Sequence, residues 1–236
     1  AWVGSGSEPR PKEEATAGRI SMSDGYPRSA TDGQSVLKTR GGAADVQDSL
    51  PPHRIAASLT AEASPRLRRV ALASDHRGYA AKMRLIERLS GVGCDVEGLE
   101  AVDDFGCDDG SRGCDYPDYA IPVARLVASG EYDAAILLDG SGIGMGIAAN
   151  KVPGIRAATC HDEITARIAR EHNHCNVLCV GTDLVGERTL FRVAETFLVT
   201  PFTGGRHVRR VAKLAEHEDS VFATVEDAQT ARRLSS

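Results

Sequence analysis

No apolar run in this sequence of 236 residues approaches the length of a membrane-spanning helix, so a membrane protein is not expected. The opening segment, AWVGSGSEPRPKEE, also lacks the basic-then-apolar order of a secretory signal. Basic residues are not in excess either, because 28 Lys and Arg are set against 33 Asp and Glu and the formal net charge is -5. A nucleic-acid binder usually presents a basic face, so we expect no nucleic-acid partner.

The six cysteines form no C-x-x-C pair, and several lie within apolar runs, where cysteine behaves as a small buried hydrophobe. A disulfide framework is not expected in a chain of this length. Together with the missing secretory signal, this cysteine usage predicts a reduced, cytoplasmic protein.

The rest of the chain is organised around residues 134–151, AAILLDGSGIGMGIAANK. Four apolar residues at 135–138 are typical of a short buried strand, and they lead into Asp139, glycines at 140, 142, 144 and 146, and a helix-forming run. A strand that ends in a carboxylate and a glycine-rich turn, and restarts as a helix, presents unpaired backbone N–H groups and the positive end of a helix dipole. Such a turn suits a phosphate or a developing oxyanion, so we predict that it is the floor of an active site.

Two common nucleotide-binding signatures are missing from this stretch. No Gly-Lys-Ser/Thr follows the glycines, as a phosphate-binding loop of the NTPase type requires. A dinucleotide fingerprint has a third glycine five residues after its first, and Met145 and Ile147 hold those places. The remaining interpretation is a loop that brings backbone close to a small ligand, with one carboxylate at its mouth.

The chain divides into three predicted segments. Residues 1–68 sustain no helical or strand period and are rich in Gly, Ser, Ala, Pro and mixed charge, so we predict a disordered N-terminal extension. Residues 69–218 are predicted to form the folded domain, and 219–236 a frayed C-terminal tail. Strands are expected over 70–73, 94–99, 133–138, 155–160 and 176–181, and helices around 85–89, over 121–127, 161–172 and 187–199, and from the turn at 203–207 to about 218.

Strands that alternate with helices of this length predict right-handed crossovers and a doubly wound, mostly parallel sheet of the α/β class. Ligands of such sheets bind beyond the carboxyl ends of the strands. The residues that follow three of the strands, 74–76, Asp139 with its glycines, and 160–162, should therefore meet along one edge. The aspartate-rich segment 100–119 lacks the ligand spacing of a calcium loop and is predicted to be a solvated loop.

Three groups of polar residues are candidates for chemistry. Asp75 and His76 follow the first strand, where a helix N-cap beside a surface histidine is the alternative interpretation. The segment 171–174, EHNH, lies between a helix and a strand, where cationic side chains near the negative end of the helix dipole are the alternative. His172, His174 and Cys175 are possible metal ligands, but no second cluster completes a tetrahedral site, so we predict no metal.

The third group, Arg206, His207, Arg209 and Arg210, opens the last helix. Cations oppose the helix dipole at that end unless they face an anion, which favours a phosphate-binding role. A carboxylate, histidines, an oxyanion-ready turn and an arginine cluster together suit one reaction class. That class is proton transfer next to a carbonyl on a phosphorylated small molecule.

Five motifs, SDHRGY at 74–79, DYPDYA at 115–120, GSGIGMGIAANKVPGIRAA at 140–158, REHNHCNVLCVG at 170–181 and GGRH at 204–207, together resemble the ribose-5-phosphate isomerase type B family, which includes galactose-6-phosphate isomerase subunits. The resemblance covers residues 69–218, and the motifs occur in order and at family spacing. It implies a Rossmann-like three-layer sandwich and a sugar phosphate as substrate. It also implies homodimers or homotetramers with active sites shared between two subunits, and no metal or nucleotide cofactor.

The resemblance also implies roles for individual residues. Asp75 and His172 would assist opening of the sugar ring. The phosphate would contact His76, Arg206 and Arg210. The remaining residues would surround the reacting carbons. The sugar oxygens and the enediolate would be held by Asn173 and by the amides of Gly140, Gly142 and Gly144. Ser141 would lie beside the base, and Tyr116 would line the pocket.

Asp139 is the main departure from the family pattern, because many members carry a cysteine base at this position. Others supply a glutamate from the position of Met145, which cannot take a proton. We therefore expect Asp139, which has the same short reach as cysteine, to shuttle the proton between C1 and C2. His174, where an aspartate often stands, and Asp183, where some members carry an arginine near the phosphate, bear on the identity of the substrate.

The expected function is an aldose–ketose isomerase that converts ribose 5-phosphate to ribulose 5-phosphate through a cis-enediolate. One alternative is an isomerase of a six-carbon sugar phosphate, because pocket depth cannot be read from a sequence. Another is a sugar-phosphate-binding protein in which the change from cysteine to Asp139 has weakened catalysis. A Rossmann oxidoreductase is the third, and it would have to bind a nicotinamide cofactor.

Overall fold

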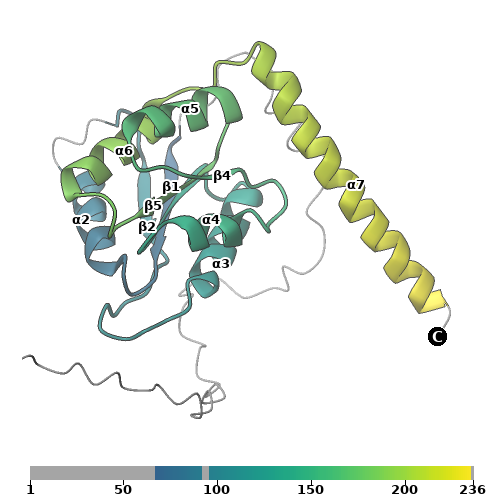
Figure 1. Ribbon diagram of the computed structural model, residues 1–236, viewed down its shortest axis with the longest axis horizontal. Helices are drawn as coiled ribbons and strands as arrows, with labels where there is room; N and C mark the ends of the chain where they lie inside the picture. The colour runs from purple at the N-terminus through teal and green to yellow at the C-terminus, as the bar shows by residue number, and fades with distance from the viewer. Residues whose placement is uncertain (1–66, 92–95, 235–236) are drawn as a thin grey trace, which may run out of the picture. The chain divides into compact units, whose positions relative to one another are not determined.

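The computed structural model describes residues 67–91 and 96–234, with side chains as far as residue 221. Within these residues five strands alternate with six helices (Figure 1). The strands are β1 (Arg69–Ser74), β2 (Ala101–Asp104), β3 (Ala134–Asp139), β4 (Ala157–Thr159) and β5 (Val177–Gly181). The helices are α2 (Tyr79–Ser90), α3 (Pro117–Ala128), α4 (Ile143–Ala149), α5 (Glu163–Asn173), α6 (Glu187–Val199) and α7 (Arg206–Leu234). The predicted extension over 1–68 lies outside the described residues except for its last two.

The five strands form one sheet in the order β2-β1-β3-β5-β4, and every pair of neighbours is parallel. From β1 the chain crosses to β2 on one side, whereas β3 leads to β5 and β4 on the other. The reversal lies between β1 and β3, the point at which doubly wound sheets bind ligands beyond the carboxyl ends of the strands. Asp75 and Asp139 lie at this switch point, because one follows β1 and the other ends β3.

The core consists of two apolar layers, one on each face of the sheet. Side chains alternate along a strand, so Leu72 packs on one face and Ala73 on the other. The first face is covered by α2, α5 and α6, which bring in residues such as Leu85 and Phe197. The second is covered by α3 and α4. Helices on both faces of a parallel sheet confirm the predicted Rossmann-like three-layer α/β sandwich.

The second predicted strand was misplaced. Residues 92–95 lie outside the described residues, residues 96–99 are not in a strand, and β2 lies at Ala101–Asp104 in the segment predicted to be a loop. β2 is an edge strand whose residues are partly or fully exposed, and it contains two aspartates, so it lacks the apolar run that marks a buried strand. Its position depends on pairing with β1, where Arg69 is opposite Ala101. The other predicted strands, and the predicted helices except the last, are confirmed with small differences at their ends.

Helix α7 is longer than the sequence pattern predicted. We expected it to end near residue 218, and it continues to Leu234 through most of the predicted tail. No Gly or Pro interrupts residues 206–234, so nothing in the local sequence stops the helix. Its contact with the sheet domain includes a 2.7 Å hydrogen bond from the amide of Gly154 to Glu218. Across the part of the chain that the structure describes, no helix combines the length and apolar character needed to cross a membrane.

Candidate active site

Two buried carboxylates lie side by side where β1 and β3 end. The amide of Asp75 donates to the carbonyl of Leu138 over 3.2 Å, which joins the residue after β1 to the β3 residue directly before Asp139. The exposed fraction is 6% for Asp75 and 5% for Asp139. Burying a carboxylate is costly unless hydrogen bonds compensate, so the donors around these two side chains define the site.

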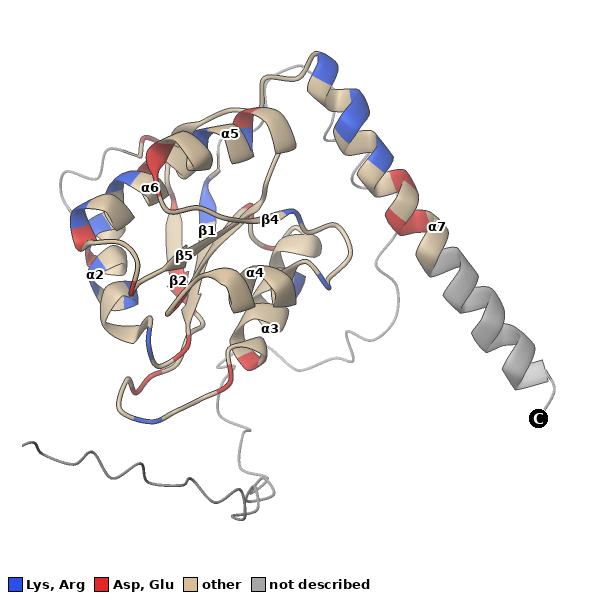
Figure 2. Ribbon diagram, viewed as in Figure 1, with Lys and Arg blue, Asp and Glu red and all other residues tan. Residues whose placement is uncertain are grey.

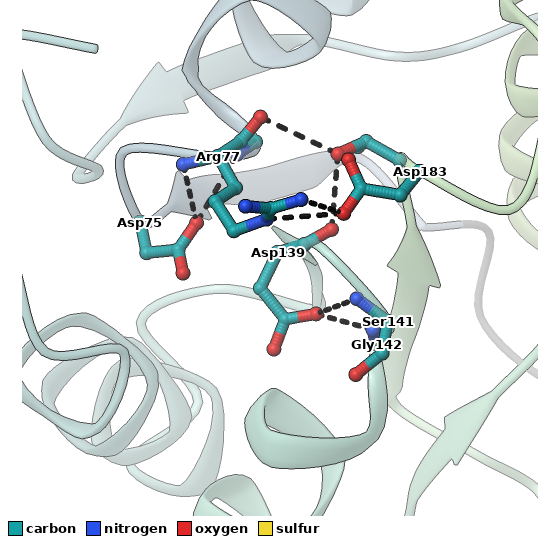
Figure 3. A network of polar contacts seen from close by, with 8 residues as sticks. Asp75, Arg77, Asp139, Ser141, Gly142 and Asp183 are labelled. Carbon is teal, nitrogen blue, oxygen red and sulfur yellow. Dashed lines mark hydrogen bonds and ion pairs between the residues drawn. The ribbon is translucent and has the colours of Figure 1, made fainter. Parts of the chain in front are cut away.

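Asp139 is held by the backbone of the glycine-rich turn that follows it. Its Oδ1 accepts hydrogen bonds from the amides of Ser141, at 2.8 Å, and Gly142 (Figure 3). Its Oδ2 accepts only a longer bond, 3.3 Å, from the amide of Met145. The turn therefore binds the anionic carboxylate of its own chain through one oxygen, and the second oxygen keeps lone pairs for another partner.

The glycines allow the turn to pack closely around this carboxylate. Gly142 has a φ of 78°, and a Cβ there would lie 2.8 Å from the Thr159 side chain and 3.0 Å from the Gly181 amide nitrogen. Only glycine fits this left-handed position without displacing the β5 backbone. At Gly144 a Cβ would meet the ring of Tyr116 at 3.0 Å, so the ring covers the turn at this point. The predicted pocket residue Tyr116 is therefore next to the predicted glycines.

Asp75 organises the turn that leads into α2. Its Oδ1 accepts bonds from the amides of Arg77, at 2.8 Å, and Gly78, at 3.1 Å. The alternative interpretation of Asp75 as a helix N-cap is therefore wrong, because the N-cap residue of α2 is Gly78 and Asp75 closes the turn before it. Figure 3 shows the other oxygen directed away from both amides.

Arg77 is a site residue that the sequence reasoning missed. Its guanidinium donates from Nε, at 3.0 Å, and from Nη2 to Oδ2 of Asp183, on the turn after β5. The hydrogen bond to Asp183 raises the pKa of Arg77, and the charges of Asp75 and Asp139 act in the same direction. Figure 3 shows the guanidinium beside Asp139 and joined to Asp183. The available signal was the position of Arg77 inside the SDHRGY motif, directly after two predicted site residues.

Two histidines also contact this edge of the sheet. His76 Nδ1 accepts a 3.3 Å bond from the amide of Cys114, in the loop between β2 and α3. His161, directly after β4, donates from Nε2 to the carbonyl of Ser141 over 3.1 Å. The sequence placed His161 at this edge correctly but without a role. Asp162 caps α5, because its carboxylate accepts a 2.7 Å bond from the amide of Thr165, and this bond lowers its pKa.

The remaining predicted residues lie at the other edge of the sheet. His172 and Asn173 end α5 just before β5 begins, and Arg206 opens α7 after α6 has returned to the same edge. A 3.2 Å bond from the amide of Thr203 to the carbonyl of Glu171 joins these two segments. Because all strands are parallel, this is the amino edge, opposite the edge where Asp139 lies. The predicted set is thus split, with Asp75, His76, Tyr116, Asp139, Gly140, Ser141, Gly142 and Gly144 on the carboxyl edge, and His172, Asn173, Arg206 and Arg210 on the amino edge.

The amino-edge residues form a cationic cluster. The imidazoles of His172 and His207 are stacked, with centroids 4.2 Å apart and planes within 4°. Arg206 Nε lies 3.5 Å from His207 Nε2. Burial lowers the pKa of His207, and the nearby His172, Arg206 and Arg210 lower it further. Figure 2 shows the basic residues concentrated in the first turns of α7, and such a cluster suits an anion.

His174 follows this cluster in the left-handed conformation, at a φ of 50°, and is 8% exposed. Its Nδ1 has no hydrogen-bond partner, and its ring stacks on Phe202. Burial, together with the charges of Arg156 and Arg170, lowers the pKa of His174 to about 4. Within residues 67–91 and 96–221, no three His, Cys, Asp or Glu side chains are grouped so as to hold a metal ion.

A cavity of about 570 Å³ lies between β4, α5 and α7. Its lining includes apolar residues such as Ile168, Val211 and Leu214. Of the predicted site residues, only Asn173 lines it. This cavity is therefore separate from the carboxylates of the carboxyl edge and touches only the border of the cationic cluster.

Comparison with known proteins gives a consistent family of relatives. A model of the family described as Ribose/Galactose Isomerase matches residues 70–214. YwlF of Bacillus subtilis is 46% identical over 151 residues, which cover 64% of this chain and 97% of that protein. Ribose-5-phosphate isomerase B of Escherichia coli is 38% identical over 153 residues, covering 64% of this chain and 97% of the relative.

Solved structures agree with this result. The structure of ribose-5-phosphate isomerase B from Clostridium thermocellum superposes with a TM-score of 0.60 at 42% identity. The match covers 65% of this chain and 99% of that chain. The described domain therefore corresponds to nearly the whole of these proteins, and the additional length lies in the flanking segments.

Proposed function

This chain belongs to the ribose/galactose isomerase family, and from this premise we propose that it interconverts ribose 5-phosphate and ribulose 5-phosphate. The observation that carries the proposal is the pair of buried carboxylates, Asp75 and Asp139, at the switch point of the sheet. An aldose–ketose isomerase needs a base beside a group of donors for the enediolate oxygen. The glycine-rich turn supplies both within a few residues.

We further propose that two copies of the chain form each active site. His76 and Arg206 are both expected to contact the phosphate, yet they belong to opposite edges of one sheet. If the carboxyl edge of one copy faces the amino edge of the other, both groups reach the same ligand. A twofold dimer satisfies this relation twice, because each copy offers both edges. The opposite charges of the two edges support this arrangement.

The proposed reaction begins with ring opening by Asp75 and by His172 of the partner subunit. Oδ2 of Asp139 then removes the proton from C2 of the open aldose and returns it to C1. In the same step the hydroxyl proton of O2 is transferred to O1, which yields the ketose. Positioned general bases of this kind contribute about 10²–10⁴-fold to the rate. Arg206 and Arg210 of the partner subunit hold the phosphate as a charge-assisted anchor.

The bonds to Asp139 suggest how the enediolate is stabilised. Before the reaction, the amides of Ser141 and Gly142 donate to the anionic carboxylate. When Asp139 takes the proton from C2, its negative charge is neutralised and the carboxyl group becomes a weaker acceptor. The negative charge now lies on the substrate oxygen, and the same amides are free to donate to it. The amides of the turn thus stabilise the negative charge first on Asp139 and then on the enediolate oxygen, without a large movement of the backbone.

The test is an isomerase assay of the full chain with a panel of pentose and hexose phosphates labelled with deuterium at C2. Turnover of ribose 5-phosphate with loss of label to water is expected, together with loss of both signals in Asp139→Ala. Asp118→Asn, at an exposed carboxylate of α3, is the matched control and should behave as the wild type. Turnover of hexose phosphates alone would identify the six-carbon alternative. Binding without turnover or exchange for every sugar would overturn the enzyme proposal.

A further inference from the structure

Two thiols occupy the loop between β2 and α3, directly beside His76. The first, Cys107, is 4% exposed and firmly held by its backbone. Its amide donates to the carbonyl of Ser74 over 2.9 Å, and its carbonyl accepts a 2.7 Å bond from the buried ammonium of Lys82. Lys82 in turn pairs with Asp104 at 2.8 Å, so the start of this loop is fixed to the end of β1.

The second thiol, Cys114, lies at the other end of the loop and is partly exposed. Its amide donates to His76 Nδ1 over 3.3 Å, and its Sγ lies 3.8 Å from the same nitrogen. The thiol also lies close enough to Cys107 and to the hydroxyl of Tyr119 to influence the pKa of both groups. Cys114 therefore contacts both a predicted phosphate ligand and a second thiol.

We propose that Cys107 and Cys114 form a reversible oxidation site, and that their disulfide withdraws Cys114 from His76 and weakens binding of the sugar phosphate. The effect on binding rests on the proposed function, whereas the disulfide itself does not. Three observations carry the proposal: the contact between the thiols, the contact of one of them with His76, and the fixed position of the other.

Cys114 is the thiol that reacts first. Thiolates are the reactive form, and burial raises the pKa of Cys107 to about 11, which keeps that thiol protonated and shielded. Cys114 is more exposed and adjoins an imidazole nitrogen that already accepts its amide proton. His76 Nδ1 lies 3.8 Å from the Cys114 sulfur, so a polar group adjoins the more exposed of the two thiols.

The oxidant is a peroxide, and the chemistry balances in two steps. The Cys114 sulfur attacks hydrogen peroxide, the O–O bond breaks, and a sulfenic acid and one water form. The Cys107 sulfur then attacks the oxidised sulfur, the S–O bond breaks, and a second water leaves with the proton of Cys107. The two thiols have together lost two electrons and two protons to the peroxide.

The position of the loop determines the consequence for the site. Cys107 cannot move without breaking its bonds to Ser74 and Lys82, so closure of the disulfide must move Cys114. Gly113, with open space around its Cα, lets the backbone adjust at this point. Tyr116 follows two residues later, and its ring covers Gly144. A shift of Cys114 therefore alters His76 and Tyr116 together.

The three described thiols outside this pair include no partly exposed member comparable to Cys114. Cys160, Cys175 and Cys179 are all at most 5% exposed. Desolvation raises the pKa of Cys160 and of Cys175 to about 11, and that of Cys179 as well. They lie in or next to β4 and β5, where the strand backbone is held in the sheet. Cys160→Ser is therefore the matched control for loss of a buried thiol at this edge.

The disulfide is tested in the full chain by treatment with hydrogen peroxide, alkylation of remaining thiols and digestion with trypsin. Cleavage after Arg88, Arg112 and Arg125 puts Cys107 in peptide 89–112 and Cys114 in peptide 113–125. The disulfide joins these two peptides. Linked peptides are expected from the wild type, from Cys160→Ser and from Cys94→Ser, which removes the other cysteine of peptide 89–112. Their absence from oxidised wild type, or their presence in Cys107→Ser, would overturn the proposal.

The link to binding is tested by steady-state kinetics of the same oxidised samples. Loss of one charge-assisted contact to the phosphate predicts a rise of about tenfold in KM, with a smaller change in kcat, that dithiothreitol reverses. Cys107→Ser should keep its KM through the same treatment. Linked peptides with an unchanged KM would overturn the coupling to His76. Linked peptides in a chain without isomerase activity on any sugar would overturn the proposed function and leave the oxidation site established.

Discussion

The two edges of the sheet hold side chains of opposite charge. Backbone amides bind the acidic side chains at one edge, and backbone carbonyls bind the basic side chains at the other. On the carboxyl edge, Asp75 and Asp139 accept bonds from backbone amides. On the amino edge, Arg156 donates from Nε to the carbonyl of His174 over 2.8 Å, and Arg170 donates to the carbonyl of Thr200 over 3.2 Å. Helices α2 to α6 begin at the carboxyl edge and end at the amino edge, so their free amides lie at the first edge and their free carbonyls at the second. The ends of these helices thus favour acids at the carboxyl edge and bases at the amino edge, whereas α7 begins at the amino edge with basic residues.

This sorting has a consequence for catalysis. Isomerisation of a sugar phosphate needs a carboxylate base and a cationic phosphate site within one ligand length, and a single sheet holds them at opposite edges. In the proposed dimer a second copy would solve the problem, because its amino edge would be complementary to the carboxyl edge of the first. The requirement for both edges can therefore be tested with substitutions that remove functional side chains from one edge at a time.

The largest effect is expected from mixing variants damaged at different edges. Asp139→Ala and His172→Ala should each lower kcat/KM by about 10²–10⁴-fold. After subunit exchange between the two, half of the dimers are mixed and carry one intact site, so about a quarter of wild-type activity should return. Asp139→Ala mixed with Asp75→Ala, damaged at the same edge, is the control and should regain nothing. A mixture no more active than its parts would show that each site belongs to one chain.

The next effect concerns the rigidity of the carboxyl edge. Gly142→Ala should lower the free energy of unfolding by about 2–4 kcal/mol, from the left-handed backbone and from contact with β5. It should also lower kcat, because the turn that holds Asp139 must shift. Urea denaturation measures the first effect and the isomerase assay the second. Gly186→Ala, where a Cβ meets nothing within 4 Å, is the control and should change stability by less than about 0.5 kcal/mol. Equal effects at the two glycines would contradict a rigid turn.

The sequence predicted the carboxyl edge better than the amino edge for a physical reason. The apolar run at 135–138 and the glycines after it are local signals, because a buried strand and a left-handed turn each restrict the residue types that fit. Residues 172–173 belong to a motif that comes before a strand, and their order in the chain already assigns them to the amino edge. The motifs alone, however, predict one set of site residues and do not indicate whether one subunit or two supply them.

Two further features depended on contacts between distant residues. The pair of Arg77 with Asp183 joins residues 106 positions apart, and no local pattern encodes it. The strand β2 has a weak pattern of its own and is specified mainly by its pairing with β1. Tertiary contacts override local preference in both cases.

A smaller effect is expected from pH at the amino edge. His174 has a folded pKa of about 4, below the usual value of 6.5, so the unfolded chain binds its proton first as the pH falls. The wild type should therefore lose about 2 kcal/mol more stability than His174→Asn between pH 7.5 and 4.5. Asparagine tolerates the left-handed backbone of this position. Chemical denaturation at both pH values measures the difference, and His217→Asn, at an exposed histidine, controls for loss of an imidazole. Parallel pH profiles for wild type and His174→Asn would contradict a buried neutral ring.

The smallest effect is expected at the mouth of the carboxyl edge. The side chains of Arg77 and Asp183 are 56% and 45% exposed, so their ion pair should contribute little to stability and should weaken in high salt. Arg77 also offsets the charges of Asp75 and Asp139, whereas Asp183 adds a further negative charge to the same edge. Arg77→Met should therefore destabilise the protein more than Asp183→Asn, and the double variant should resemble Arg77→Met. Urea denaturation of the four proteins at low and high salt measures these differences. If Asp183→Asn were the more destabilising change, the ion pair would serve mainly to hold Asp183 in place. The charge of Arg77 would then not be needed to offset the negative charges of Asp75 and Asp139.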